Sequence, residues 1–314
     1  MSFTSAHKTK QNTLTTREID VPLRLFLSDM VSEVVNKYGD EIVSIALFGS
    51  ATTKEWIKGK SDIDFIVVVK HRDLKKDIEN YLNKLILELD RKHDLQLVRT
   101  CSTYTRGPNP IVNLLYKVEN TLLFGQPFFI LSLDQIDFEK GTIADNRIRF
   151  VTSIFDSLSI FVAKMRQTGM VIYGKDLIGE LRFSPSRFDK IRTAFAPLWI
   201  IVMSLFSFPI DELFSLNHSI KATTWACEDV LFAFNIPLSS TTEELDRIER
   251  IFNGHEKMDF SHAKKTMILK RKLVSKGDVS KGFVAKYILQ TILFVLTLYH
   301  GASQLARTRL DMRA

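Results

Sequence analysis

The stretch IALFGSATTKEWIKGKSDIDFIVVVK, residues 45–70, contains two apolar runs of the kind that form buried strands. The first run ends at Gly49 and Ser50, and the second begins with Asp62 and Asp64 after eleven intervening residues. Strand side chains alternate between the two faces of a sheet, so both acids are predicted to point to the same side. Two carboxylates side by side repel each other unless a cation lies close to both, so this stretch predicts a cation site.

A third acid follows a long amphipathic segment. Residues 73–93 place apolar side chains at helical spacing, and Asp94 then precedes an alternation of apolar and polar residues. This alternation predicts a third strand over residues 94–101. If that strand lies beside the second, three carboxylates meet at one edge of the sheet. Carboxylate oxygens favour Mg²⁺ or Mn²⁺, and two such ions can hold both oxygens of a phosphoryl displacement.

The turn at Gly49 and Ser50 has the residue types that a phosphate site needs. Glycine permits a tight turn and a close approach of the backbone, and the N–H groups after it can bind a phosphate. Ser50 adds a hydroxyl donor. We expect this turn to hold the β- and γ-phosphates of a nucleoside triphosphate, with the acids and their metal ions at the α-phosphate. Ser61 is predicted to form the turn into the second strand, where its hydroxyl can also reach a phosphate or a metal-bound water.

This pattern resembles the signature of the nucleotidyltransferase superfamily related to DNA polymerase beta. That signature is apolar-Gly-Ser, about nine to thirteen residues, and then Asp-apolar-Asp-apolar; here it reads FGS at 48–50 and DIDF at 62–65. The surrounding KSDIDFIVV is most similar to minimal and aminoglycoside-type nucleotidyltransferases. The resemblance covers roughly residues 25–131.

The resemblance implies a role for each motif residue. Asp62 and Asp64 would bind the metal ions, and the Gly-Ser turn would bind the triphosphate. The third carboxylate of the family corresponds to Asp94, with Asp90 at the end of the preceding helix as the alternative. Asp94 would help to hold the catalytic metal and accept the proton of the acceptor.

The pattern of elements predicts two domains. After a flexible tail (1–16), residues 17–138 are expected to form an α/β (α+β) nucleotidyltransferase-like domain with a small mixed sheet. From 139 to 314 strand signals nearly vanish, which predicts an all-α helical bundle domain. Its expected helices are 146–168, 186–208, 217–235, 241–252 and 281–305.

Composition limits the class of protein. The formal charge is +7 and the pI is about 9.2, which favours an anionic partner. Cys101 and Cys227 stand far apart, and the seven histidines show no metal-ligand spacing, so a disulfide framework and a zinc site are not expected. The polar N-terminus does not have the apolar core of a secretory signal. We therefore expect a cytoplasmic protein.

Two apolar segments raise the question of a membrane. Residues 194–210 contain two prolines, and residues 283–301 contain a lysine, a glutamine and a histidine. Spanning a bilayer takes roughly 18 to 20 uninterrupted apolar residues. We therefore expect core helices and no membrane partner, with membrane attachment as the alternative.

The expected activity is the transfer of a nucleoside monophosphate from a nucleoside triphosphate to an acceptor hydroxyl, an EC 2.7.7-type reaction with Mg²⁺ or Mn²⁺. The acceptor stays open between a small molecule, a protein side chain and an RNA 3′ end, with a lean to the first two. Lys221, early on a predicted helix, is a candidate phosphate ligand, and a homodimer is compatible with the sequence. The rival interpretations are an inactive nucleotide sensor or partner-binding module on the same fold, and a nucleic-acid-binding protein.

Overall fold

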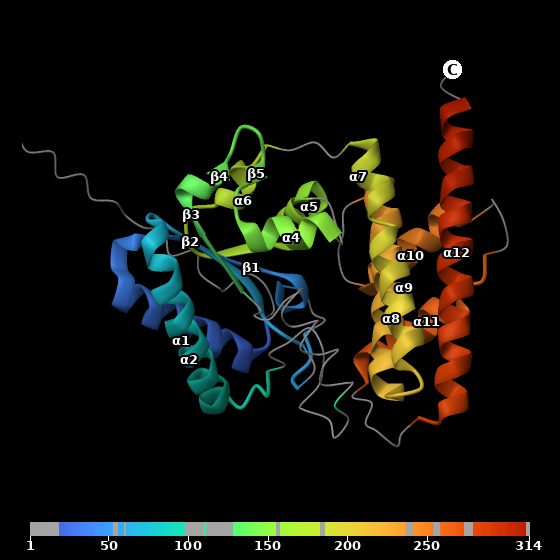
Figure 1. Ribbon diagram of the computed structural model, residues 1–314, viewed down its shortest axis with the longest axis horizontal. Coiled ribbons are helices and arrows are strands. Elements are labelled where there is room, and N and C mark those ends of the chain that lie inside the picture. The colour runs from blue at the N-terminus through green and yellow to red at the C-terminus, as the bar shows by residue number, and fades with distance from the viewer. Residues whose placement is uncertain are drawn as a thin grey trace, which may run out of the picture. The chain divides into compact units, whose positions relative to one another are not determined.

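The computed structural model describes residues 19–52, 56–59, 61–97, 110, 128–154, 158–182, 186–236, 241–253, 258–272 and 279–311. Contacts divide the chain into two compact units, which are coloured mainly blue to green and mainly yellow to red in Figure 1. The first unit comprises Met1–Leu97, Gln126–Asp145 and Thr168–Arg182. The second comprises Val98–Gly125, Asn146–Gln167 and Phe183–Ala314.

A four-stranded mixed sheet forms the centre of the first unit. Its order is β3-β2-β1-β6. The central strand β1 runs antiparallel to β2 and to β6, and β3 runs parallel to β2. The strands are β1 Ile42–Phe48, β2 Asp64–Val69, β3 Phe128–Ser132 and β6 Met170–Gly174. The predicted small mixed sheet is confirmed, and its first two strands lie where the apolar runs placed them.

Two helices cover one face of this sheet (Figure 1). Helix α1, Val21–Tyr38, begins with a proline in its first turn and ends at Gly39, whose φ is +54°. Helix α2, Lys75–His93, packs beside α1. Lys92 and His93 of α2 both contact the Asp29 carboxylate of α1, at 2.7 and 2.9 Å. Their shared core is closed and apolar, and includes Phe26, Leu27, Met30, Val34, Ile45, Leu47, Phe65, Val67, Ile78, Leu82, Phe128 and Ile130.

The chain after α2 does not form the predicted third strand over residues 94–97. Asp94 adopts a left-handed conformation, with φ 49° and ψ 44°, and ends the helix. Leu95 is fully buried, and the buried Asp90 carboxylate accepts the N–H of Leu97 at 3.0 Å. The apolar and polar residues after Asp94 therefore form the C-terminal cap of α2, and Leu95 packs into the core. Residues 98–101 of the predicted strand lie outside the described residues, and the observed neighbour of β2 is β3.

The segment after residue 168 returns to the sheet, so the structural units differ from the predicted division at 138/139. Strand β6 pairs with β1, and Gly174 faces Ser44 in register. Gly174 has φ +76°, and a Cβ there would lie only 2.1 Å from the carbonyl oxygen of Val43. The Ser44 hydroxyl donates to the carbonyl of Lys175 at 2.6 Å. The sequence analysis assigned this region to the helical domain because the pairing joins residues more than 120 positions apart.

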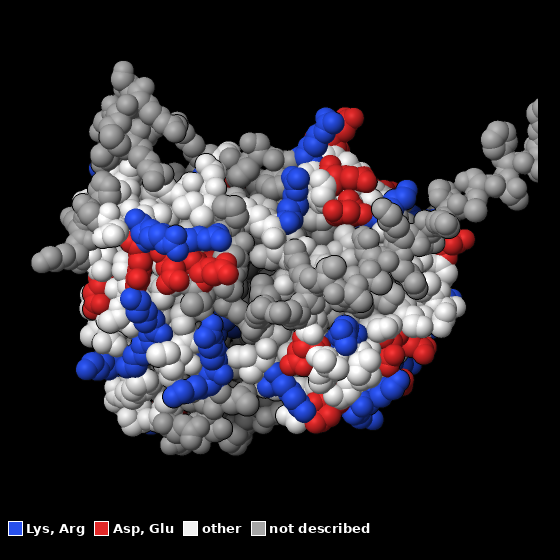
Figure 2. All heavy atoms as spheres, turned by 180° about the vertical axis from the view of Figure 1, so that it is seen from behind, with Lys and Arg blue, Asp and Glu red and all other residues white. Residues whose placement is uncertain are grey.

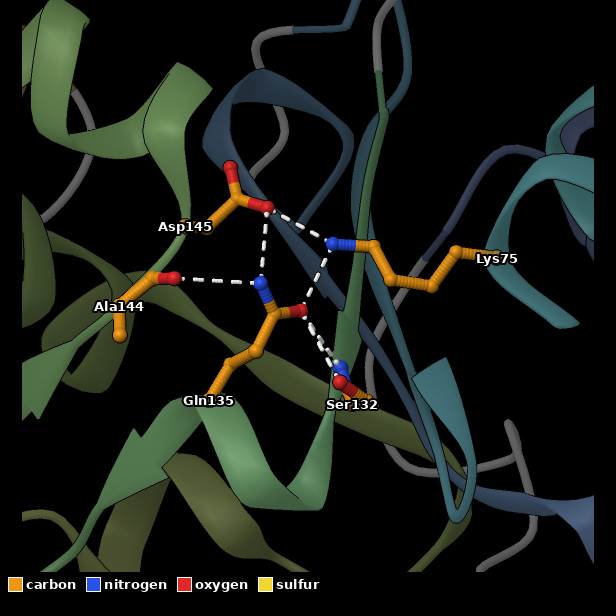
Figure 3. A network of polar contacts seen from close by, with 5 residues as sticks. All are labelled: Lys75, Ser132, Gln135, Ala144 and Asp145. Atoms are coloured by element: carbon orange, nitrogen blue, oxygen red, sulfur yellow. Dashed lines mark hydrogen bonds and ion pairs between the residues drawn. The ribbon is translucent and has the colours of Figure 1, made fainter. Parts of the chain in front are cut away.

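A polar network ties together the far parts of the first unit (Figure 3). The Lys75 ammonium donates to Gln135 Oε1 and Asp145 Oδ2, both at 2.7 Å, and Gln135 Nε2 donates to the carbonyl of Ala144 at 3.2 Å. Ser132 donates its N–H and its hydroxyl to Gln135 Oε1. The network joins α2 to the end of β3 and to the short strands β4 Ile136–Asp137 and β5 Thr142–Ile143.

This network is a stabilising element of the first unit. Ser132 pairs with Val69, at the end of β2 opposite to Asp64. The side chains of Lys75 and Asp145 are only 20% and 15% exposed. Removing one partner of a mostly buried ion pair leaves the other charge poorly solvated.

We expect Lys75→Met to destabilise the first unit by about 3 kcal/mol. The measurement is thermal unfolding followed by the fluorescence of Trp56, which packs on the core of this unit, in a Trp199→Phe/Trp225→Phe background. The exposed neighbour Lys76 provides the control, Lys76→Met. Equal transitions for the two variants would show that the network contributes no stability.

The second unit is a bundle of helices around α9, Glu212–Ala233. Helices α7, α8, α10, α11 and α12 contact α9. The long helices α8, α9 and α12 lie side by side in Figure 1. The predicted helical region is confirmed. The helices are α4 Asn146–Ile154, α5 Leu158–Thr168, α7 Arg187–Arg192, α8 Phe195–Ser207, α10 Thr241–Phe252, α11 Ser261–Arg271 and α12 Lys281–Asp311.

Candidate active site

The Gly-Ser turn and the second acid of the pair lie against each other. Strand β1 ends at Phe48, which faces Asp64 in the antiparallel register with β2. The chain then turns at Gly49, where φ is +72°, a conformation that glycine adopts without strain. A Cβ at this position would lie 2.8 Å from Asp64 Oδ2. The carboxylate therefore occupies the space that the missing side chain leaves open.

A hydrogen bond within the turn and the burial of its last two residues fix the conformation of the turn. Residues Gly49–Thr52 form a single 3₁₀ turn, and the Thr52 hydroxyl donates to the carbonyl of Gly49 at 2.8 Å. Ala51 and Thr52 are buried, and Ala51 belongs to the core beneath α1 and α2. Gly49 and Ser50 stay partly exposed. The core thus fixes the shape of the turn on the side of Ala51 and Thr52, whereas Gly49 and Ser50 lie on its partly exposed side.

The strand period separates the paired acids from the core. Ile63 and Phe65 are buried in the cluster that α1 and α2 cover. Asp62 and Asp64 alternate with them and are only partly buried. The predicted common orientation of the two acids therefore agrees with the burial of their neighbours.

Ser61 closes the turn that leads into the acids. Its hydroxyl oxygen accepts the N–H of Ile57 at 3.0 Å, and its own N–H donates to the carbonyl of Ile57 at 2.9 Å. This pair of bonds matches the structural role that the sequence predicted for Ser61. The hydroxyl proton remains available as a donor, because a serine oxygen can accept one bond and donate another.

Asp94 lies next to the loop before β2. Its carboxylate accepts from Lys58 Nζ at 2.6 Å, and its side chain is 72% exposed. The hydrogen bond from Lys58, with a weaker one from Gln96, lowers the pKa of the Asp94 carboxyl. Among the described residues, no group of three or more His, Cys, Asp or Glu side chains is arranged to hold a metal ion. The role of Asp94 as the third carboxylate rested on the predicted strand and loses that support.

Asp90 and Lys221 are the two other residues that the sequence analysis considered for the site. Asp90, the alternative third acid, uses its carboxylate to bind the N–H of Leu97. Lys221 lies partly exposed on α9 and belongs to the second unit, whereas the turn and the acids belong to the first. Lys58 was missed by the sequence analysis; the only signal was the turn that the following Gly59 indicates.

Comparison with known proteins agrees with this site. Residues 27–120 match the family model described as a nucleotidyltransferase domain, and this range includes the turn and both acids. No curated protein matches the chain. Among solved structures, spectinomycin adenyltransferase AAD(9) from Enterococcus faecialis, determined with ATP and spectinomycin, has 10% sequence identity and a TM-score of 0.43. The alignment covers 88% of this chain and 98% of that one. Residues 27–120 are therefore similar to a nucleotidyltransferase domain, as the sequence motifs implied.

Proposed function

We propose that the protein transfers a nucleoside monophosphate from a nucleoside triphosphate to an acceptor hydroxyl. The position of the Asp64 carboxylate against the Gly49 turn supports this proposal most directly. It brings together, within the segment that matches the nucleotidyltransferase domain, the two features that the reaction needs. One is a backbone turn suited to phosphate, and the other is a pair of acids suited to a metal ion.

The donor set at this point fits a divalent cation. Asp62 and Asp64 supply hard carboxylate oxygens, which Mg²⁺ and Mn²⁺ prefer. Because position 49 is glycine, the Asp64 carboxylate can lie directly against the turn, where a Cβ would come within 2.8 Å of Oδ2. Asp62 and Asp64 would hold the cation. When bound, the cation would neutralise negative charge on the phosphate oxygens during transfer.

The residues of the turn would position the triphosphate. The backbone N–H groups of the turn and the Ser50 hydroxyl are the donors that would bind its phosphate oxygens. The bond between the α-phosphorus and the bridging oxygen then breaks as the acceptor oxygen bonds to phosphorus, pyrophosphate leaves, and the hydroxyl proton passes to a base or to water. Most of the acceleration would come from positioning and charge neutralisation.

We favour a small molecule or a protein as the acceptor over an RNA 3′ end. Figure 2 shows one face of the molecule, on which Lys and Arg side chains lie beside Asp and Glu side chains, with wide uncharged areas between them. Proteins that bind RNA usually present basic residues gathered on one face or along one groove. The described charged side chains on this face are of both signs and interspersed, although the second unit as a whole carries more basic than acidic residues.

The direct test is incubation of the full chain with each α-labelled nucleoside triphosphate, Mg²⁺ or Mn²⁺, and separate pools of RNA, proteins and aminoglycosides. We expect one pool to become labelled and pyrophosphate to be released. If the wild type labels no pool beyond the level of an Asp62→Asn/Asp64→Asn variant, the proposal is wrong.

The position of Asp94 favours one alternative, a nucleotide-binding module without catalysis. Its carboxylate is paired with Lys58 at 2.6 Å. Such a module would bind a nucleoside triphosphate in a metal-dependent way and release no pyrophosphate. The same labelling experiment, combined with equilibrium binding, separates the two functions.

Asp94→Asn is expected to change the rate of nucleotidyl transfer by less than about fivefold, because an exposed ion pair contributes little energy. Steady-state kinetics of the variant beside the wild type provide the measurement. A loss comparable to that of Asp64→Asn would instead restore Asp94 as the third carboxylate.

A further inference from the structure

The described part of the second unit exposes a row of large apolar side chains on α7 and α8. They are Phe188, Ile191, Phe195, Trp199 and Phe206, with exposed fractions of 70%, 64%, 61%, 50% and 73%. Their spacing of three, four, four and seven residues places them on one side of a nearly continuous helix. Monomeric soluble proteins rarely expose apolar rows of this size, and such rows mark interaction surfaces.

The opposite side of α8 is fixed in the bundle. Ile200, Ile201, Ser204 and Ser207 are buried there. The Ser204 hydroxyl donates to the carbonyl of Ser215 on α9 at 2.8 Å, and hydroxyl contacts also join Ser204 to Ser219 and Ser207 to Ser215. The helix was expected to be a core helix, and the structure buries only one of its sides.

Helix α12, like α8, has one exposed apolar side and one buried side. Leu289, Leu293 and Leu296 are 57%, 57% and 52% exposed and follow one another at helical spacing. On the other side of the helix, Tyr287 and Thr291 are buried against α11 and make hydroxyl contacts with Thr266 and His262. Helices α8 and α12 also contact each other within the unit. We call the exposed row on α7 and α8, together with the three leucines of α12, the apolar helix surface.

Both helices are candidates for contact with lipid. Phe188–Ser207 and Lys281–Arg307 are long and apolar enough to cross a membrane by length and composition, although 39% of each apolar window is buried inside the protein. The inner sides hydrogen-bond to α9 and α11, which holds both helices in the bundle. A helix with one side bound to protein and one apolar side can instead lie in the plane of a bilayer surface.

The charge of the second unit indicates whether a second copy of the chain or a bilayer binds this surface. The second unit contains 25 Lys and Arg against 15 Asp and Glu, whereas the first contains 18 against 21. A second copy of the chain would therefore bring one strongly basic unit against another, which like-charge repulsion opposes. An anionic bilayer attracts the same unit. Trp199 and the phenylalanines are also side chains that settle at the boundary between headgroups and acyl chains.

We propose that the apolar helix surface docks on an anionic phospholipid bilayer. The aromatic row of α7 and α8 and the leucines of α12 insert at the boundary of the acyl chains. Basic side chains of the same unit, such as the exposed Lys286 one turn before Leu289, contact the lipid phosphates. This places the protein at a membrane surface, which the sequence analysis kept only as the alternative to core helices.

The test is co-flotation of the full chain with vesicles of phosphatidylcholine alone or mixed with phosphatidylglycerol. We expect partitioning only into the anionic vesicles, weakened by salt. Brominated lipid is expected to quench the fluorescence of Trp199, measured in a Trp56→Phe/Trp225→Phe background. Trp199→Ser/Phe206→Ser is expected to lower the partition coefficient by about tenfold for each side chain removed.

A matched control removes equally exposed apolar side chains outside the surface. Val21 and Leu25 of α1 are 55% and 49% exposed, and Val21→Ser/Leu25→Ser is expected to partition as the wild type does. Absence of partitioning, or equal partitioning of both double variants, would overturn the proposal. A wild-type dimer in sedimentation velocity that Trp199→Ser/Phe206→Ser converts to a monomer, without vesicle binding, would assign the surface to a second copy. The measurement needs no nucleotide, so its outcome is independent of the proposed transfer activity.

Discussion

Asp64→Asn is expected to lower nucleotidyl transfer by about a thousandfold and to leave the fold intact. The Asp64 carboxylate lies against the Gly49 turn, where the phosphates and a divalent cation would meet. Asparagine keeps the volume of the side chain but removes the charge that would hold the cation. Loss of a metal contact worth several kcal/mol in the transition state corresponds to about three powers of ten in rate.

The measurement is the release of labelled pyrophosphate under saturating nucleoside triphosphate, with Mg²⁺ and with Mn²⁺. Asp62→Asn is expected to behave in the same way, because the strand alternation predicts that Asp62 points to the same side as Asp64. Asp73→Asn provides the control, since Asp73 is exposed and lies beyond the opposite end of β2. Retained activity in both Asp62→Asn and Asp64→Asn would remove these acids from the mechanism.

The features of the site that depend on nearby residues could be predicted from the sequence. Residues 42–48 and 64–69 are continuous apolar runs rich in β-branched side chains, and they form β1 and β2. The strand period then placed Ile63 and Phe65 toward the core and the two acids away from it. The close approach of Gly49 to Asp64 follows from the antiparallel register of the same two strands.

The parts that depended on non-local pairing were predicted less well. The alternation after Asp94 covers only three residues, which suits a buried helix cap as well as a strand. Strand β6 was missed because its partner β1 lies far away in the sequence. The sequence analysis placed the short run before Gly174 in the helical domain, and its pairing with the β1 edge shows that it is a strand.

The exposed side of α8 could not be read from its composition either. Residues 194–206 are apolar on all sides except for Ser204, so periodicity does not show which side faces the core. The structure resolves this through the hydroxyl contacts of Ser204 with α9. The sequence analysis interpreted this apolar segment as a core helix. The structure buries only one side of α8 and leaves the other side exposed as part of the apolar helix surface.

Gly49→Ala is expected to lower the transfer rate by at least about a hundredfold, more than its effect on stability explains. A residue with a side chain at φ +72° costs about 1–2 kcal/mol of stability. The new Cβ would also lie 2.8 Å from Asp64 Oδ2, so the carboxylate must move away from the turn. A misplacement of a catalytic group by about 1 Å can cost a hundredfold in rate.

Gly39 allows the two effects to be separated. It also has a positive φ, +54°, but a Cβ there would meet nothing within 4 Å. Gly39→Ala should therefore show a similar loss of stability, measured by thermal unfolding, and a transfer rate close to that of the wild type. Equal losses of rate in both variants would mean that backbone strain, and not the displacement of Asp64, limits the reaction. A rate unchanged in Gly49→Ala would show that the close approach of Asp64 to the turn is not needed for the reaction.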